Sequence, residues 1–114
     1  MTRIRVTAGD LSMSGALNDS ATARKIAAAL PIQADGITWG DEIYFEIPVI
    51  AEAEDPQAAV PAGTLAYWPD GHAFCIFFGQ KPYSPVNVIG TLDGDAAAFR
   101  KVASGERVPV ETET

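Results

Sequence analysis

Residues Gly63 to Leu92 read GTLAYWPDGHAFCIFFGQKPYSPVNVIGTL, which is the most informative stretch of the chain. It predicts strands over 64–68 and 73–78 around a Pro-Asp-Gly turn, then an aromatic loop at Tyr83-Ser84-Pro85 and a third strand over 86–92. The segment 73–78, AFCIFF, is apolar at every position. A strand of this kind is buried on both faces, so we expect it in the middle of a sheet.

The residues before this stretch predict a hairpin and a helix. Residues 3–7 and 11–17 alternate between apolar and polar positions, and a Gly-Asp pair separates them. Apolar residues then recur with helical spacing over 23–30, after the N-cap candidates of 18–20. Pro31 should end this helix.

The remaining segments complete a mainly β chain. Weak strand character over 32–39 is interrupted by Gly36, and 42–47 alternates clearly. The acidic, alanine-rich segment 51–62 should form a surface loop, and a short helix over 96–103 precedes a last strand over 107–111. Eight short strands and two helices result, and eight strands can close into a barrel with a filled interior. The residues that we expect to be buried in it are Ile4, Val6, Phe45, Leu65, Phe74, Ile76, Val88 and Phe99.

Composition limits the classes of function. The chain has 114 residues, which suits one domain over 1–114, with a flexible tail at 112–114. Eight basic against 15 acidic residues give a net charge of −7, which disfavours nucleic acid and anionic membranes as partners. Without a signal peptide or a long apolar run, we expect a cytoplasmic protein, a monomer or weak homo-oligomer. The only cysteine, Cys75, should be a buried thiol with a raised pKa.

Several segments together resemble a known family. They are Leu17 to Ala23 (LNDSATA), Trp39 to Phe45 (WGDEIYF), Gly63 to Pro69 (GTLAYWP), and Phe77 to Pro85, with Gly90 following. In this combination the chain resembles the small bacterial and archaeal cyclophilin-like proteins, whose function is unknown. The resemblance covers nearly the whole chain. It implies a closed eight-stranded cyclophilin-like β-barrel with two short capping α-helices, and it does not by itself imply prolyl isomerase activity.

The residues themselves argue against that activity. A cyclophilin active site has an arginine on the third strand that donates to the prolyl amide as it twists. The corresponding span here, 31–50, contains no Arg or Lys, and its charged residues are all acidic. A standard prolyl isomerase is therefore disfavoured, and we assign no catalytic residue.

A candidate binding groove follows from the same resemblance. Aromatic walls with a few polar groups suit a small neutral or cationic ligand, or a peptide. The residues that we expect near this groove are Tyr44, Glu46, Phe78, Gln80 and Tyr83. A simpler interpretation is that Tyr44 and Glu46 only form the solvated face of a strand. Trp39 and Trp68 suit either packing at the barrel rim or a binding wall.

No other motif specifies chemistry. His72 lies at a turn and has no nucleophile motif around it, and Asp93 with Asp95 suits a turn and a helix cap rather than a calcium loop. We therefore expect no metal and no cofactor. Two classes of function remain. The first is a non-catalytic binding module. The second is an enzyme, either a degenerate or non-standard peptidyl-prolyl isomerase or an unrecognised one that uses a carboxylate such as Glu46.

Overall fold

Alternating apolar residues form nine strands of a single antiparallel sheet in the computed structural model, which describes residues 1–113. The strands are β1 (Thr2–Ala8), β2 (Leu11–Leu17), β3 (Ile32–Asp35), β4 (Ile37–Thr38), β5 (Glu42–Glu46), β6 (Thr64–Trp68), β7 (Ala73–Phe77), β8 (Asn87–Leu92) and β9 (Arg107–Thr112). The α-helix is α1 (Ala21–Ala29), and two 3-10 helices are η1 (Pro69–Gly71) and η2 (Ala96–Lys101).

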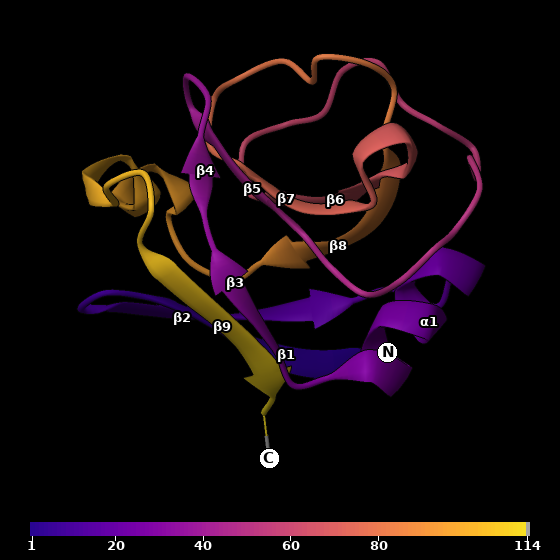
Figure 1. The fold of residues 1–114 in the computed structure, drawn as a ribbon, viewed down its shortest axis with the longest axis horizontal. Helices are drawn as coiled ribbons and strands as arrows, with labels where there is room; N and C mark the ends of the chain where they lie inside the picture. The colour runs from indigo at the N-terminus through magenta and orange to yellow at the C-terminus, as the bar shows by residue number, and fades with distance from the viewer. Residues whose placement is uncertain (114) are drawn as a thin grey trace.

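The sheet curls into a nearly closed barrel because its two ends belong to one chain segment (Figure 1). The strand order is β3-β9-β1-β2-β8-β6-β7-β5-β4, so β3 pairs with β9 and β4 pairs with β5. Gly36 separates β3 from β4, which is why the one strand expected over 32–39 becomes two. A Cβ atom at Gly36 would lie 2.9 Å from Cγ2 of Ile43 and 3.0 Å from Cγ2 of Val108. Glycine therefore allows the close approach at which the barrel closes.

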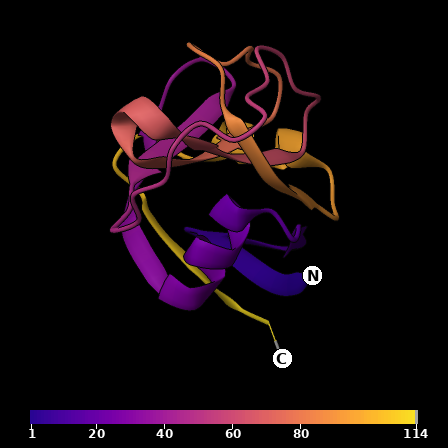
Figure 2. The ribbon, with the colours of Figure 1, turned by 90° about the vertical axis from the view of Figure 1, so that its right-hand side faces the viewer.

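The helices lie at opposite sides of the barrel (Figures 1 and 2). Ser20 caps α1 by accepting a hydrogen bond from the amide of Ala23 at 3.1 Å, and α1 buries Ile26. The second helix expected from the sequence is the 3-10 helix η2, which ends at Lys101 and buries Phe99. Both elements thus contribute apolar side chains to the core, as expected of capping helices.

The barrel interior holds seven of the eight residues that the sequence predicts to be buried. The exception is Val88, which is half-buried, whereas its neighbour Ile89 is fully buried. The pairing of β6 with β8 shifts between Leu65 and Ala66. A β-bulge there gives β8 one extra residue, so the alternation of inward and outward side chains changes along β8. The prediction for Val88 was wrong because strand alternation alone does not reveal a bulge.

Strand β7 lies between β5 and β6 and is buried on both faces, as predicted. Phe74 and Ile76 belong to the interior cluster. On the outer face, Cys75 and Phe77 form a second apolar cluster with neighbouring residues. The long segments before β6 and after β7 arch over this outer face (Figure 1).

The segment 51–62 is anchored and not merely a solvated loop. The hydroxyl of Tyr67, inside the barrel, donates to the carbonyl of Val49 at 2.6 Å and accepts from the amide of Ala51 at 3.2 Å. The carboxylate of Glu54 accepts hydrogen bonds from the amides of Ala21 and Thr22 at 3.0 and 2.9 Å. The segment therefore fixes the first turn of α1.

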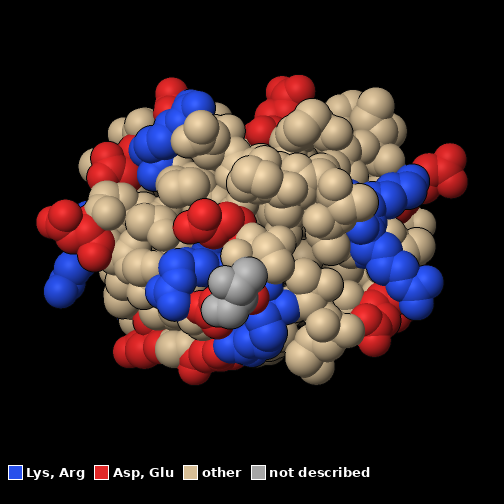
Figure 3. All heavy atoms as spheres, turned by 90° about the horizontal axis from the view of Figure 1, so that it is seen from below, with Lys and Arg blue, Asp and Glu red and all other residues tan. Residues whose placement is uncertain are grey.

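Several charged residues outside this region form pairs of opposite sign. Seen from below, Lys and Arg side chains adjoin Asp and Glu side chains (Figure 3). On β1, Arg3 pairs with Asp93, and Arg5 pairs with Glu113 at 2.6 Å. Strand β9 extends through Thr112, and Thr114, the end of the expected flexible tail, lies outside the described residues. Within residues 1–113, no helix combines the length and the apolar character needed to cross a membrane.

Candidate functional site

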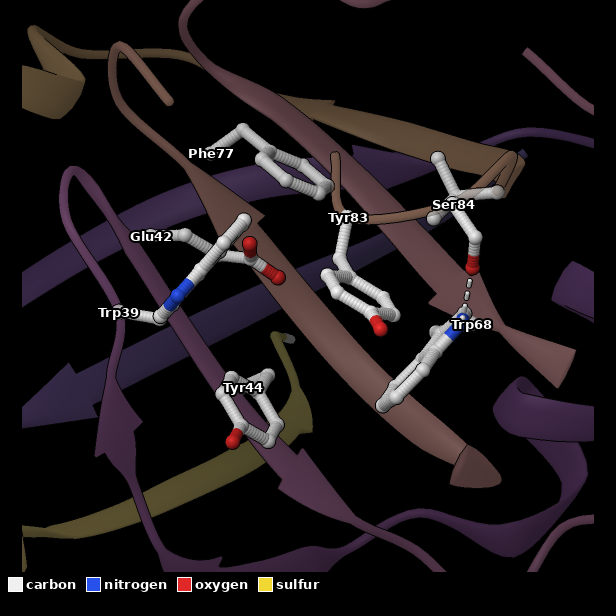
Figure 4. Close-up of a pocket in the computed structure, with 8 residues that line it drawn as sticks. Trp39, Glu42, Tyr44, Trp68, Phe77, Tyr83 and Ser84 are labelled. Carbon is white, nitrogen blue, oxygen red and sulfur yellow. Dashed lines mark hydrogen bonds between the residues drawn. The ribbon is translucent and has the colours of Figure 1, made fainter. Parts of the chain in front are cut away.

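A pocket of about 350 Å³ lies on the outer face of β5, β6 and β7, beneath the loop 79–86. Figure 4 shows the side chains from these separate segments converging on one space. The residues that line it are Trp39, Glu42, Tyr44, Trp68, Phe77, Tyr83, Ser84 and Val86. The pocket therefore combines aromatic rings with a few polar groups, of which only Glu42 carries a formal charge.

The hairpin of β4 and β5 supplies one side of the pocket. Gly40 adopts φ +58° in the turn, and the amide of Trp39 donates to the carbonyl of Glu42 at 2.9 Å. Strand alternation then places Glu42 and Tyr44 on the outer face, and Ile43 and Phe45 inside the barrel. Opposite Glu42, Phe77 of β7 completes the pocket floor.

Four rings, which we call the aromatic wall, surround the pocket: Trp39, Tyr44, Trp68 and Tyr83. They contact one another edge to face in succession. The ring centroids of Trp39 and Tyr83 lie 5.9 Å apart, with an angle of 80° between the planes. The corresponding values are 6.0 Å and 75° for Trp68 with Tyr83, and 6.3 Å and 87° for Tyr44 with Trp68. The planes of neighbouring rings are thus nearly perpendicular to one another.

Backbone pairing between loops holds the far side of the pocket. The amide of Gln57 donates to the carbonyl of Val86 at 2.8 Å, and the amide of Val86 donates back at 3.0 Å. The indole Nε1 of Trp68 donates to Oγ of Ser84 at 2.6 Å (Figure 4). These bonds tie the loop 79–86 to the sheet and to the segment 51–62.

The carboxylate of Glu42 is the electrostatic centre of the site. Only 6 % of the surface of Glu42 is exposed to solvent. Burial raises the pKa of Glu42 to about 7, and the neighbouring thiol of Cys75 opposes this shift only in part. Burial, with the nearby Glu42 charge, also raises the pKa of the Cys75 thiol well above its usual value. The burial of the thiol expected from the sequence is thus confirmed, and the direction of its pKa agrees with that expectation.

Two of the five residues expected near a groove line this pocket, namely Tyr44 and Tyr83. Glu46 lies exposed at the end of β5, outside the lining. Phe78 is buried in the barrel interior, with its ring centroid 6.4 Å from that of Phe99. Gln80 packs against Gly40 behind the hairpin turn. The structure therefore brings Tyr44 and Tyr83 together and places the other three elsewhere, and a role in binding at this pocket stays a prediction for Tyr44 and Tyr83.

Glu42 was missed at this site, although it shares a strand face with Tyr44 and Glu46. Alternation identified that face, but it could not say which of the three residues the loop 79–86 covers. Trp39 and Trp68 belong to the pocket lining, and their role as a binding wall stays a prediction. Their positions beside turns were the available signal, since turns at the end of strands set the rim of a pocket.

In the folded protein, arginines from other elements neutralise part of the negative charge of the wall formed by residues 31–50. Arg100 approaches Asp41 from η2, with Nη2 to Oδ2 at 3.1 Å, and Arg107 approaches Asp35 from β9 at 3.2 Å. Cations from other elements therefore reach this wall, but each already pairs with a carboxylate. Among residues 1–113, no three His, Cys, Asp or Glu side chains are grouped as a metal site would require.

The fold and site define a class of protein: a nearly closed antiparallel barrel, capped at both ends, with a ligand-sized pocket on its outer wall. The sequence profile described as "Cyclophilin-like" matches residues 2–111, so the chain belongs to the cyclophilin-like family. It is similar to the hypothetical protein AF2241 from Archaeoglobus fulgidus, with 37% identity, a TM-score of 0.84, and coverage of 98% of this chain and 95% of that one.

A more distant likeness shows the fold alone. The structure of McbB in complex with tryptophan matches with 15% identity and a TM-score of 0.76, over 95% of this chain and 44% of McbB. A comparison with curated proteins gives no match.

Proposed function

We propose that the protein binds a small molecule in the pocket bounded by the aromatic wall and Glu42. The observation that carries this proposal is the convergence of a buried carboxylate and the Ser84 hydroxyl within an otherwise apolar, preformed pocket. Ligand sites typically have this composition, with few polar groups that orient the ligand and apolar surface that supplies affinity. The volume of about 350 Å³ suits a compact molecule or one side chain of a peptide rather than an extended chain.

The two tryptophans offer a direct test. The chain contains only two, Trp39 and Trp68, and both line the pocket. Intrinsic tryptophan fluorescence therefore reports on this site alone. A screen of small fragments and amino acids should give ligands that change the emission and shift amide resonances of β5 and the loop 79–86. Tryptophan, the molecule bound in McbB, is screened by amide shifts only, because its own emission overlaps that of the protein.

A matched pair of variants separates the pocket from the remaining surface. Tyr83 and Ile50 are exposed to similar extents, 77% and 73%, but only Tyr83 lines the pocket. Tyr83→Ala should weaken binding of each fragment several-fold, since a lost aromatic contact is worth about 1 kcal/mol. Ile50→Ala should leave binding unchanged. Equal effects of the two variants, or a screen without any ligand for the pocket, would contradict the proposal.

A second candidate function, acid–base catalysis, is favoured by the same carboxylate. A carboxyl group whose pKa lies near 7 can both take up and release a proton at neutral pH, as general acid–base catalysts do. In this alternative, Glu42 replaces Glu46 as the reacting carboxylate. Any turnover found with a pocket ligand should disappear in Glu42→Gln and persist in Glu46→Gln; the reverse result would reject it.

A further inference from the structure

The pocket has features that favour a positive charge over a neutral or negative one. On the basis of the proposed function, we infer that its ligand is a small organic cation, an ammonium group on a compact apolar body. The aromatic wall would surround this group, and the carboxylate of Glu42 would neutralise it.

The arrangement of the rings is the first support. Aromatic faces carry partial negative charge, and a cation near such faces is attracted, most strongly when water is excluded. The rings of the aromatic wall meet at 75° to 87°, and all four residues line the same pocket, so the rings surround a common space in different orientations. A flat stack would instead offer one face only. The aromatic wall therefore suits the roughly spherical charge of an alkylammonium group.

The second support is a carboxylate without a countercharge. In the part of the chain that the structure describes, no Lys, Arg or His nitrogen lies within 4.0 Å of Glu42, whereas the adjacent Asp41 pairs with Arg100. Burying an unpaired carboxylate is unfavourable. A bound cation would remove this cost, and an anion would increase it. Lys81, which lies on the loop 79–86, is exposed and does not line the pocket.

Protonation of Glu42 then couples cation binding to pH. The other titratable groups facing Glu42 are the hydroxyls of Tyr44 and Tyr83 and the thiol of Cys75. A cation binds best to the ionised carboxylate, and burial raises the pKa of Glu42 to about 7. Affinity for a cation should therefore rise by roughly tenfold from pH 6 to pH 8 and then level off. A neutral ligand of the same shape should show no such rise.

The test uses a pair of probes that differ in charge alone. Choline and 3,3-dimethylbutan-1-ol have nearly the same shape, but the second carries carbon in place of the quaternary nitrogen. Both are titrated into the full chain at pH 6 and pH 8, with tryptophan fluorescence and amide chemical shifts as readouts. We expect choline to bind at least about tenfold more tightly at pH 8, as one desolvated ion pair or cation–π contact provides.

Variants on β5 provide the matched control. Glu42→Gln keeps the shape and the aromatic wall, so it should reduce the preference for choline to the part that the rings alone supply, with its pH dependence lost. Glu46→Gln removes a charge four residues further along β5, outside the pocket, and should change neither the preference for choline nor its pH dependence. Comparable binding of the two probes, or equal effects of the two variants, would overturn the inference while leaving a neutral ligand, and thus the proposed function, possible. Failure of choline to bind a pocket that accepts neutral fragments would likewise overturn it.

Discussion

The indole Nε1 of Trp68 donates a hydrogen bond to the hydroxyl of Ser84 over 2.6 Å. This bond connects the end of β6 with the loop that carries Tyr83, whose ring meets that of Trp68 edge to face. One side chain thereby orients a tryptophan and fixes the position of the neighbouring tyrosine. Ser84 is thus expected to preorganise the aromatic wall without being its main contact surface.

Substitution of Ser84 should separate binding from stability. Ser84→Ala leaves the half-buried indole N–H of Trp68 without its partner, so the ring becomes free to turn. We expect ligand affinity to fall about three- to tenfold, since a net hydrogen bond is worth roughly 0.5–1.5 kcal/mol. Ser84→Thr keeps the hydroxyl and serves as the control. Equal affinities of Ser84→Ala and the wild type, measured by fluorescence titration, would contradict a positioning role.

Glu42 should make the stability of the protein depend on pH in an unusual direction for a carboxylate. Its pKa rises from an ordinary 4.5 to about 7 in the folded state, so between these values the folded protein keeps a proton that the unfolded chain releases. The contribution of Glu42 to stability is therefore largest below pH 4.5 and is lost as pH rises through 7, by up to about 3 kcal/mol before solvent screening of the carboxylate reduces it.

Urea unfolding of Glu42→Gln can measure this loss. Relative to the wild type, the variant should gain about 2–3 kcal/mol more at pH 8 than at pH 5, because glutamine does not ionise. Asp19, Glu54 and Asp93 have lowered pKa values, so they make stability depend on pH in the opposite direction. Their contribution is the same in variant and wild type, and it cancels when the two proteins are compared. Glu46→Gln should show little difference between the two pH values. A Glu42→Gln effect independent of pH would show that the carboxylate is not held protonated.

Local sequence patterns were sufficient for the barrel, but not for its irregular points. The double-sided apolar run 73–78 predicted the central position of β7, and alternation predicted the hairpin of β1 and β2. The bulge opposite Leu65 depends on how distant strands meet, so Val88 was assigned to the wrong side. The interruption at Gly36 was visible in the sequence, but its position between Ile43 and Val108, where the barrel closes, was not. The candidate site had the same limit. Tyr44 and Tyr83 could be proposed from their residue types, but the cover over Glu42 comes from a loop about 40 residues further along the chain.

The closure of the barrel predicts a strong effect at Gly36. Because an added Cβ would lie 2.9 Å from Cγ2 of Ile43 on β5 and 3.0 Å from Cγ2 of Val108 on β9, Gly36→Ala should push these two strands apart and destabilise the fold by about 1–3 kcal/mol. Gly94→Ala is the control, since its Cβ would meet only the flexible end of Met13, at 3.1 Å. Urea midpoints that are equal for the two variants would contradict this account of closure.

The segment 51–62 gives a prediction about α1. Glu54 accepts hydrogen bonds from the amides of Ala21 and Thr22 and from the Thr22 hydroxyl, and these bonds lower the pKa of its carboxyl. This contribution is present at neutral pH and is lost as pH falls through the lowered pKa. Glu54→Gln should therefore lower the thermal midpoint at pH 7 and accelerate amide exchange in the first turn of α1, with a smaller difference at pH 3. Glu52→Gln, in the same segment, should do neither.

Prolyl isomerase activity should be negligible because, within residues 1–113, no Arg or Lys side chain is free to act as a donor at the pocket. Twisting a prolyl amide requires a fixed donor at the reacting group, and loss of such a donor costs on the order of 10²–10³ in rate. No Arg or Lys lines the described pocket, and the two arginines that reach the 31–50 wall, Arg100 and Arg107, already pair with Asp41 and Asp35.

In a protease-coupled assay on an Ala-Pro peptide, turnover should lie at least about 10²-fold below that of an authentic cyclophilin. A rate within about tenfold would contradict this prediction. Arg100→Ala, with Arg3→Ala as the control on the opposite wall, would then establish whether the Arg100 guanidinium leaves Asp41 to act as the donor.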